Sequence, residues 1–137
     1  MNPGIPALVR YRMAMAREAI EVASSALEGG HLHGAVNRLY YACFYAVSAL
    51  LLTEDYSSSK HSGIRSLFNR HWVKTGRLPV EMSAFYEELF ENRQEGDYDD
   101  FVEFMPDDVH TWHEQTVAFV ARISMELEKL LPANDGK

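Results

Sequence analysis

The sequence is poor in cysteine, proline and glycine. Its 137 residues include one cysteine, Cys43, so an intrachain disulfide and zinc sites of the CxxC type are excluded. Cys43 falls on the apolar side of a predicted helix, which indicates a small core residue in a reducing compartment. A chain of this length can bury a core without disulfides or metal, so we expect a single helical domain over residues 1–137, with its core over about 6–131.

Long hydrophobic runs are also missing. The most apolar stretch, from Val36 to Leu52, is interrupted by Asn37, Arg38 and Ser48, so we expect no membrane-spanning helix. The first six residues lack the basic segment and long apolar run that are typical of a secretory signal. We therefore expect a soluble, cytoplasmic protein with no membrane contact.

Basic residues are the minority charge. The chain has 20 acidic and 13 basic residues and a net charge of −7, which disfavours long-range attraction to a nucleic-acid backbone. The charge is nevertheless divided, because acid is concentrated over residues 87–108 and a basic cluster lies elsewhere. That cluster consists of Lys60, His61, Arg65, Arg70, His71, Lys74 and Arg77.

Helical periodicity, by contrast, runs through almost the whole chain. Proline at a first helical turn, glycine after a last turn and apolar residues at helical spacing set the expected boundaries. The predicted helices cover about 6–27, 33–53, 60–73, 79–94 and 106–131, with loops at Ser57–Ser59 and from Gly96 onward. We expect an all-α, up-and-down four-helix bundle with an additional short helix.

The central helix, 33–53, is apolar around most of its girth and must be buried on several sides. One quadrant nevertheless carries polar residues, namely Asn37, Arg38, Tyr41, Tyr45 and Ser48. This quadrant is either a satisfied internal network or the lining of a cleft. Several aromatic residues are expected on outer faces, where a two-fold interface would bury them and produce a homodimer. They are Tyr40, Phe44, Tyr45 and Trp72.

A second unusual arginine, Arg93, shares the inward stripe of its helix with Met82, Tyr86 and Leu89. A buried guanidinium must find anionic or carbonyl partners. Either it pairs with Asp97 and pins the following loop, or it faces a cleft or dimer interface and binds a phosphate.

The histidines differ in whether their sequence positions favour ligand contact, metal binding or solvent exposure. His61, beside Lys60, opens a helix, where anions are attracted, and both are candidates for ligand contact. His110 and His113 lie three residues apart but lack further ligands, so surface positions are favoured over a metal site. For His31 and His33 we expect a solvated turn.

Four segments in register carry a family resemblance. Residues 35–46, AVNRLYYACFYA, resemble the second helix of the HEPN superfamily, the higher eukaryote and prokaryote nucleotide-binding domains. The segments at 60–63, 68–76 and 93–101 resemble small stand-alone prokaryotic members in the same order. The resemblance spans about residues 15–130. It implies a four- to five-helix bundle, frequent homodimers and frequent pairing with a minimal nucleotidyltransferase encoded nearby.

Many HEPN proteins are metal-independent ribonucleases whose signature is an arginine followed, after four to six residues, by a histidine. Arg93 matches the arginine, but positions 98–100 are Tyr, Asp and Asp, and the next histidine is His110. The proton shuttle is therefore missing. The resemblance also makes Tyr98 a candidate target of nucleotide transfer by a partner enzyme.

Three function classes remain open. The first is a non-catalytic, dimeric HEPN module that binds a nucleotide or a nucleotidyltransferase partner, in a toxin–antitoxin-like pair. The second is a metal-independent endoribonuclease toxin, or its relic, with Asp97 or His61 as an atypical base. The third is an interaction bundle without a small ligand. No resident cofactor, metal or catalytic residue is assigned. The candidate ligand- or partner-binding residues are Arg38, Tyr41, Tyr45, Lys60, His61, Arg93, Asp97 and Tyr98.

Overall fold

The computed structural model describes residues 2–132, which form an all-α bundle, as the helical periodicity predicts. Five α-helices and one π-helical turn make up this part of the chain. They are α1 (Gly4–Glu28), α2 (Leu32–Leu52), α3 (His61–Phe68), the π-helical turn η1 (Asn69–Val73), α4 (Val80–Tyr98) and α5 (Pro106–Leu130).

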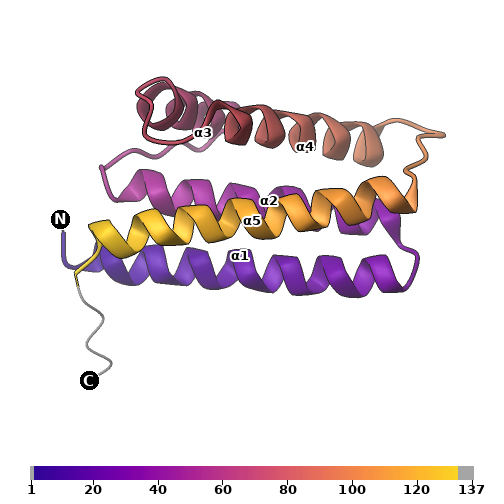
Figure 1. Cartoon of the computed structure of the whole chain (residues 1–137), viewed down its shortest axis with the longest axis horizontal. Coiled ribbons are helices and arrows are strands. Elements are labelled where there is room, and N and C mark those ends of the chain that lie inside the picture. Colours follow the sequence, from indigo (N-terminus) through magenta and orange to yellow (C-terminus); the bar gives the residue numbers. More distant parts are fainter. Residues whose placement is uncertain (1, 133–137) are drawn as a thin grey trace.

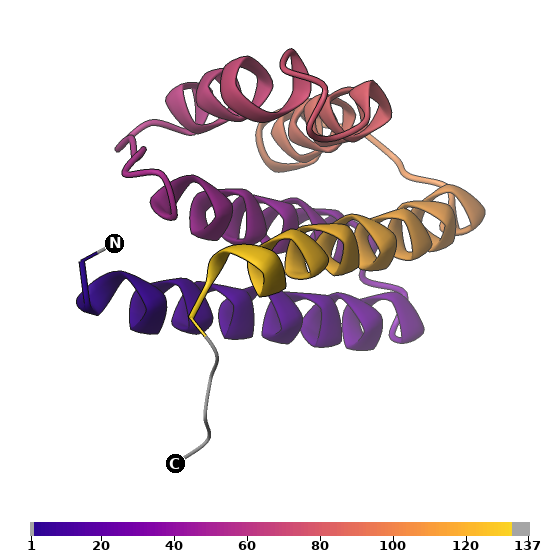
Figure 2. The same ribbon diagram turned by 60° about the vertical axis from the view of Figure 1, so that its left-hand side comes forward.

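The helices lie in layers around α2 (Figures 1 and 2). Helices α1 and α5 run along one side of α2, and the shorter α3 and α4 cover the other side. Helix α2 contacts all four of the other α-helices. Its burial therefore decides how the remaining helices are placed.

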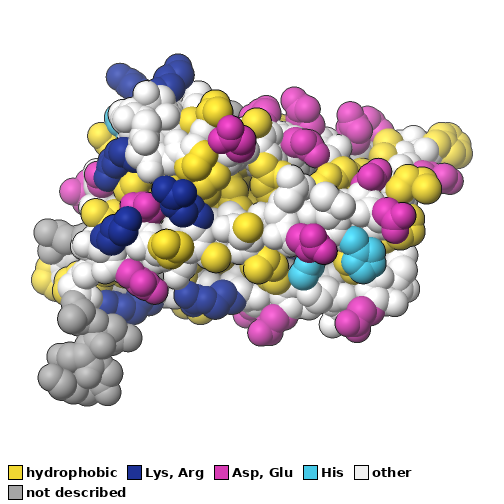
Figure 3. Space-filling model, in the orientation of Figure 1, with side chains coloured by type: hydrophobic (Ala, Val, Ile, Leu, Met, Phe, Trp, Pro, Cys, Tyr) yellow, Lys and Arg dark blue, Asp and Glu magenta, His cyan; other side chains and the backbone are white. Residues whose placement is uncertain are grey.

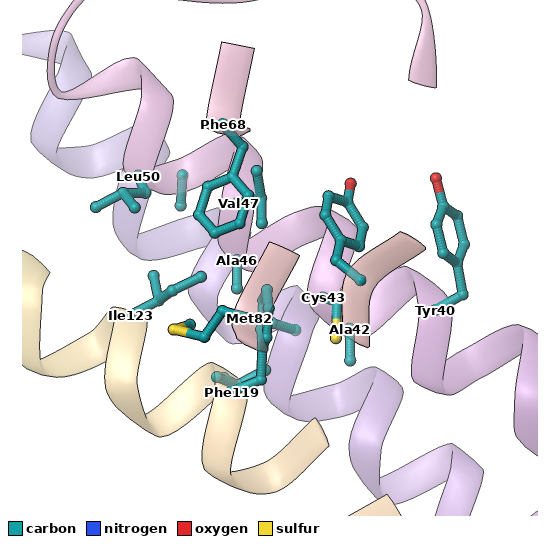
Figure 4. Close-up of a cluster of buried hydrophobic side chains, with 14 of the residues drawn as sticks. Tyr40, Ala42, Cys43, Ala46, Val47, Leu50, Phe68, Met82, Phe119 and Ile123 are labelled. Carbon is teal, nitrogen blue, oxygen red and sulfur yellow. The ribbon is translucent and has the colours of Figure 1, made fainter. Parts of the chain in front are cut away.

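The core is built around α2 from aliphatic, small and aromatic side chains (Figure 4). Leu39, Cys43 and Val47 are fully buried, and Phe119 and Ile123 of α5 pack into the same cluster. Burial raises the pKa of the Cys43 thiol well above its ordinary value, so Cys43 is a neutral core residue.

Helix α2 is long and apolar enough to cross a membrane, judged by length and composition alone, contrary to the expectation from its polar interruptions. However, 72% of its most apolar window is buried inside the bundle. A core helix covered on several sides has the same composition as a membrane span, and this burial is typical of a core helix.

The expected outward position of two aromatic residues is wrong. Tyr40 and Trp72 are almost completely buried, at 0% and 1% exposure. Tyr40 is buried because α3 and α4 cover that side of α2, and Trp72 is buried beneath the guanidinium of Arg77, 3.4 Å from its ring. Phe44 and Tyr45 are half-buried and remain partly at the surface.

Helix α4 is longer than the sequence predicts, and Gly96 lies within it and not in a loop. A Cβ at position 96 would come within 2.8 Å of the Phe104 ring, so glycine allows the chain after α4 to fold back closely onto the helix. The extra turn places Asp97 one helical turn beyond Arg93.

Helix α3 is also different in detail. It starts at His61, and Lys60 is its N-cap residue. The Lys60 amide donates to Ser58 Oγ, so the Ser57–Ser59 loop supports the start of the helix. After Phe68 the chain widens into η1, where the Lys74 amide bonds the Asn69 carbonyl. Such π-helical turns are frequent near functional sites.

His33 is not simply solvated, as expected for a turn, but ties the loop after α4 to the start of α2. Its Nδ1 lies 3.1 Å from the Gly96 carbonyl oxygen and its Nε2 lies 2.8 Å from the Val102 carbonyl oxygen. Carbonyl oxygens only accept, so both bonds form together when both ring nitrogens carry hydrogen. The ring also packs edge-on against Phe104.

The surface charge is divided along the molecule (Figure 3). Lys and Arg gather toward the end that holds α3 and the termini, with a few acidic side chains among them. Asp and Glu lie mainly on α4 and toward the opposite end. This arrangement agrees with the division of charge in the sequence.

We predict that His33→Ala loosens the loop after α4 while the bundle stays folded. One hydrogen bond to a backbone carbonyl is lost when the imidazole is neutral and two when it is protonated, and each contributes about 1 kcal/mol. Amide hydrogen exchange over residues 99–104 should therefore accelerate by about 5- to 30-fold. The control His31→Ala, an exposed neighbour in the same turn, should leave this exchange unchanged. Equal exchange in both variants would contradict the role of His33.

Candidate functional site

Helices α2 and α4 bring Arg93 and Tyr41 together. Arg93 Nη2 donates to the Tyr41 hydroxyl over 3.2 Å, and the guanidinium lies 5.4 Å from the ring centres of both Tyr40 and Tyr41. Only 12% of the Arg93 side chain is exposed. Arg93 is thus directed inward, as its place on the α4 stripe predicts, and the aromatic rings of α2 contact its charge.

Asp97 is the anionic partner of Arg93, as one of the two sequence alternatives predicts. Asp97 Oδ2 lies 3.0 Å from Arg93 Nε and also accepts from Asn37 Nδ2 over 3.1 Å. One carboxylate oxygen therefore links α4 to the beginning of α2. Because Asp97 pairs with Arg93, the inward guanidinium has an anionic partner within the protein.

Arg38 lies on the other side of this link. Its Nε and Nη2 donate to Asn37 Oδ1 over 3.1 and 2.9 Å, and its guanidinium carbon lies 4.9 Å from the Tyr41 ring centre. No carboxylate within residues 2–132 forms an ion pair with Arg38. Arg38 and Arg93 therefore share Tyr41 as a neighbour, but only Arg93 has a charged partner.

His61 reaches the same region from α3. Its Nδ1 lies 2.7 Å from the Tyr40 hydroxyl, and its ring stacks on Phe44 with 4.3 Å between ring centres. Tyr41 meets the His61 ring edge-on. The start of α3 is thus held on the aromatic surface of α2 by one hydrogen bond and three rings.

The pKa of His61 is lowered by burial first, and then by the positive charges of Arg93 and Arg65. The imidazole is therefore neutral at pH 7. Burial raises the pKa of the Tyr40 hydroxyl to about 12, so this group is protonated and can donate. Donation to Nδ1 leaves the hydrogen of the neutral imidazole on Nε2.

The remaining predicted site residues differ in their relation to this cluster. Tyr45 packs against Tyr41, and Tyr98, which is 71% exposed, lies 5.9 Å from the Arg93 guanidinium. Lys60 precedes α3 and is exposed, and its side chain forms no hydrogen bond to the cluster within residues 2–132. The fold therefore brings seven of the eight candidates into one neighbourhood, through direct contacts or ring packing.

Three participants were not among the candidates. Asn37 bridges Arg38 and Asp97, Tyr40 holds His61, and Arg65 lowers the His61 pKa from within α3. The polar quadrant of the α2 sequence already contained Asn37, so this signal was available. Tyr40 was missed because it was expected at the surface, and Arg65 because it was grouped only with the basic cluster.

The other histidines lie away from this site. His113 bonds Ser24 Oγ over 2.6 Å and so connects α5 to α1, whereas His110 is exposed. Within the described part of the chain, no group of three or more His, Cys, Asp or Glu side chains is placed to hold a metal ion.

Curated proteins from bacteria and archaea are similar to this chain. A "UPF0332 protein" of Thermotoga maritima is 44% identical over 123 residues, which cover 90% of this chain and 93% of that protein. "Putative toxin MJ0142" of Methanocaldococcus jannaschii is 36% identical over 88 residues, or 64% of this chain and 60% of that protein. "Putative toxin MJ0605" of the same organism is 28% identical over 98 residues, 72% of this chain and 73% of that protein.

A family model also matches most of the chain. The model of the HEPN domain covers residues 9–127, which include α2, α3 and α4 and hence the whole Arg38–Arg93 neighbourhood. The helical bundle, the register of the four resembling segments and this match agree. The chain belongs to the HEPN domain family.

Proposed function

We propose that this protein is a non-catalytic, dimeric HEPN-domain module that binds a nucleotide or a nucleotidyltransferase partner, as one half of a toxin–antitoxin-like pair. The observation that supports this proposal is the convergence of Arg38 and Arg93 on Tyr41, with Asp97 paired to only one of them. A guanidinium without a carboxylate partner is suited to a phosphate or to an acidic side chain of a partner protein. The toxin names of two relatives support the pairing part of the proposal.

The aromatic rings around the arginines add a second element of recognition. Tyr41, Phe44 and Tyr45 are only half-buried, so their faces and edges are accessible beside Arg38. A nucleobase can stack on such rings while its phosphate meets the guanidinium. Tyr98, exposed beside Arg93, is where we place any modification by a nucleotidyltransferase.

A ribonuclease is the second candidate, because His61 lies near enough to Arg93 for that charge to lower its pKa. In space, His61 of α3 could replace the histidine that is missing after Arg93. The bond to Tyr40 opposes this role, since a base must accept a proton and the Nε2 of this tautomer already carries one. The same Nε2–H group is suited to donate to a phosphate oxygen, which favours binding over cleavage.

The homodimer is proposed from the family and from the exposed aromatic surface. Phe44, Tyr45 and Tyr11 line a surface cavity of about 370 Å³ between α1, α2 and the loop before α3, and Tyr11 is 62% exposed. A second copy of the chain could cover these rings. In this proposal Tyr11 takes the place of Tyr40 and Trp72, which the sequence placed in the interface and which are buried within one copy of the chain.

We predict that Arg38→Met and Arg93→Met each weaken nucleotide or partner binding more than tenfold, about 1.4 kcal/mol. Methionine keeps the length of the side chain and removes the charge. Titration calorimetry with the nucleotide selected by a thermal-shift screen measures the loss, and Arg122→Met, at a partly exposed arginine of α5, is the control. Arg38→Met should retain stability, whereas Arg93→Met leaves Asp97 unpaired and melts somewhat earlier. Normal binding with a much earlier melt in both variants would show that the arginines only support the fold.

We predict that the purified protein does not cleave single-stranded RNA in the presence of EDTA, because the signature histidine is missing. Cleavage that disappears in a folded Arg93→Ala variant would contradict this prediction. If the cleavage also disappears in a folded His61→Gln variant, His61 is identified as the base. Its activity would then persist below pH 6.5, because a lowered pKa keeps the imidazole neutral there.

We predict a homodimer in solution, with twice the 15.6 kDa mass of the chain. Multi-angle light scattering at micromolar protein concentration measures this mass directly. A monomer mass under these conditions would refute the dimer.

A further inference from the structure

A second polar site lies between α3 and α4 and shares no lining residue with the Arg93–Asp97 pair. It is a pocket of about 240 Å³ whose rim and walls come from both helices and from the start of η1. Hydroxyl and amide groups predominate among its lining residues, and Phe68 is the apolar exception among them. The polar lining consists of Ser62, Arg65, Ser66, Asn69, Ser83, Tyr86 and Glu87.

Two donors at this pocket lack an acceptor. Arg65 Nη1 is buried and has no hydrogen-bond partner within the described residues, and the buried Tyr86 hydroxyl, although near enough to the Tyr40 hydroxyl to affect its pKa, forms no well-aligned bond there either. Tyr86 is 1% exposed, and the Arg65 side chain is 17% exposed. A buried donor without a partner is costly and uncommon in native proteins. Both residues line the pocket, so a ligand with several acceptor oxygens suits the donors found there.

The rest of the Arg65 guanidinium is held in place. Its Nε donates to Glu87 Oε2 over 3.1 Å, and its carbon lies 3.6 Å from the ring centre of Phe90. These contacts fix the plane of the guanidinium before any ligand arrives, which lowers the cost of binding. Glu87 is 51% exposed and lies at the rim, so its charge is partly screened by water.

The size and chemistry of the pocket favour a small oxyanion. It is smaller than most sites for drug-sized ligands, so it can take a phosphate group but not a whole nucleotide. The Arg65 and Tyr86 donors, with the hydroxyls of Ser62 and Ser66 nearby, suit the several acceptor oxygens of a phosphate. The burial that raises the Tyr86 pKa keeps its hydroxyl protonated as a donor.

We propose that the pocket between α3 and α4 binds a phosphate group, either inorganic phosphate or the phosphate of a nucleotide, through Arg65 and Tyr86. The site is separate from the surface around Arg38 and Arg93 and does not depend on the function proposed there. It has one consequence for that surface, because Arg65 lies one turn after His61 on α3. A bound anion offsets the Arg65 charge and lessens the effect of that charge on His61.

Titration of the protein with sodium phosphate at pH 7, followed by amide NMR and compared with sodium chloride at equal ionic strength, tests the proposal. Saturable shifts at residues 62–66 and 83–87 are expected. Arg65→Met should weaken binding at least about tenfold, because it removes a charge-assisted hydrogen bond. Tyr86→Phe should weaken it less, and Arg93→Met should leave it unchanged, which separates this site from the one around Arg38.

A matched pair of variants on α4 decides the case if Arg65→Met does not fold. Glu87→Gln removes the competing carboxylate and should tighten phosphate binding several-fold, whereas Glu91→Gln, exposed one turn further on, should not. Adenosine monophosphate, tested beside adenosine, distinguishes the two sources of the phosphate. Tighter binding of the monophosphate than of phosphate indicates a nucleotide, and equal binding indicates inorganic phosphate. Shifts no larger than those with chloride, binding of adenosine alone, or equal effects of the two glutamine variants would overturn the proposal and leave a pocket filled by water.

Discussion

The burial of α2 on nearly all sides is the constraint on which the rest of this structure depends. A helix with a mean hydropathy compatible with a membrane span is accommodated because α1 and α5 cover one side of it and α3 and α4 the other. Its polar residues then have only the half-exposed edge available, and this edge faces the end of α4. Arg38, Asn37 and Tyr41 are at this edge for that reason.

The aromatic side of α2 creates a second requirement, because buried tyrosine hydroxyls need partners. Helix α3 meets this requirement for Tyr40 through His61, and its Arg65 contributes positive charge to the same region. Burial lowers the pKa of His61 first, and the charges of Arg93 from α4 and of Arg65 lower it further, which explains why His61 is neutral. The short helix α3 thus contributes Ile64 and Phe68 to the core and also adds to the positive charge between α2 and α4.

Arginines beside tyrosines are the feature that these contacts between α2, α3 and α4 have in common. Three arginines from three helices surround a set of tyrosines, and acidic side chains compensate two of them while leaving donors on Arg38 and Arg65 unmatched. In this HEPN domain no histidine follows Arg93 at the signature spacing, and the proposed binding function rests on these arginines and tyrosines. The His33 bonds and the close contact of Gly96 with Phe104 hold the segment that carries Tyr98 near this region.

The sequence by itself determined the all-α class, the five helices, the central place of residues 33–53 and the inward direction of Arg93, because apolar periodicity and helix-end signals are local. For Arg93 the sequence left two alternatives open, pairing with Asp97 or a position facing a cleft or dimer interface, and the structure shows the pairing. Only the tertiary structure decided that Tyr40 and Trp72 are buried, that Gly96 continues α4, and that His33 and His61 have distant partners. These features depend on how the helices pack on α2, and the partners of His33 and His61 lie roughly 20 to 70 positions away, so local spacing contains no information about such contacts.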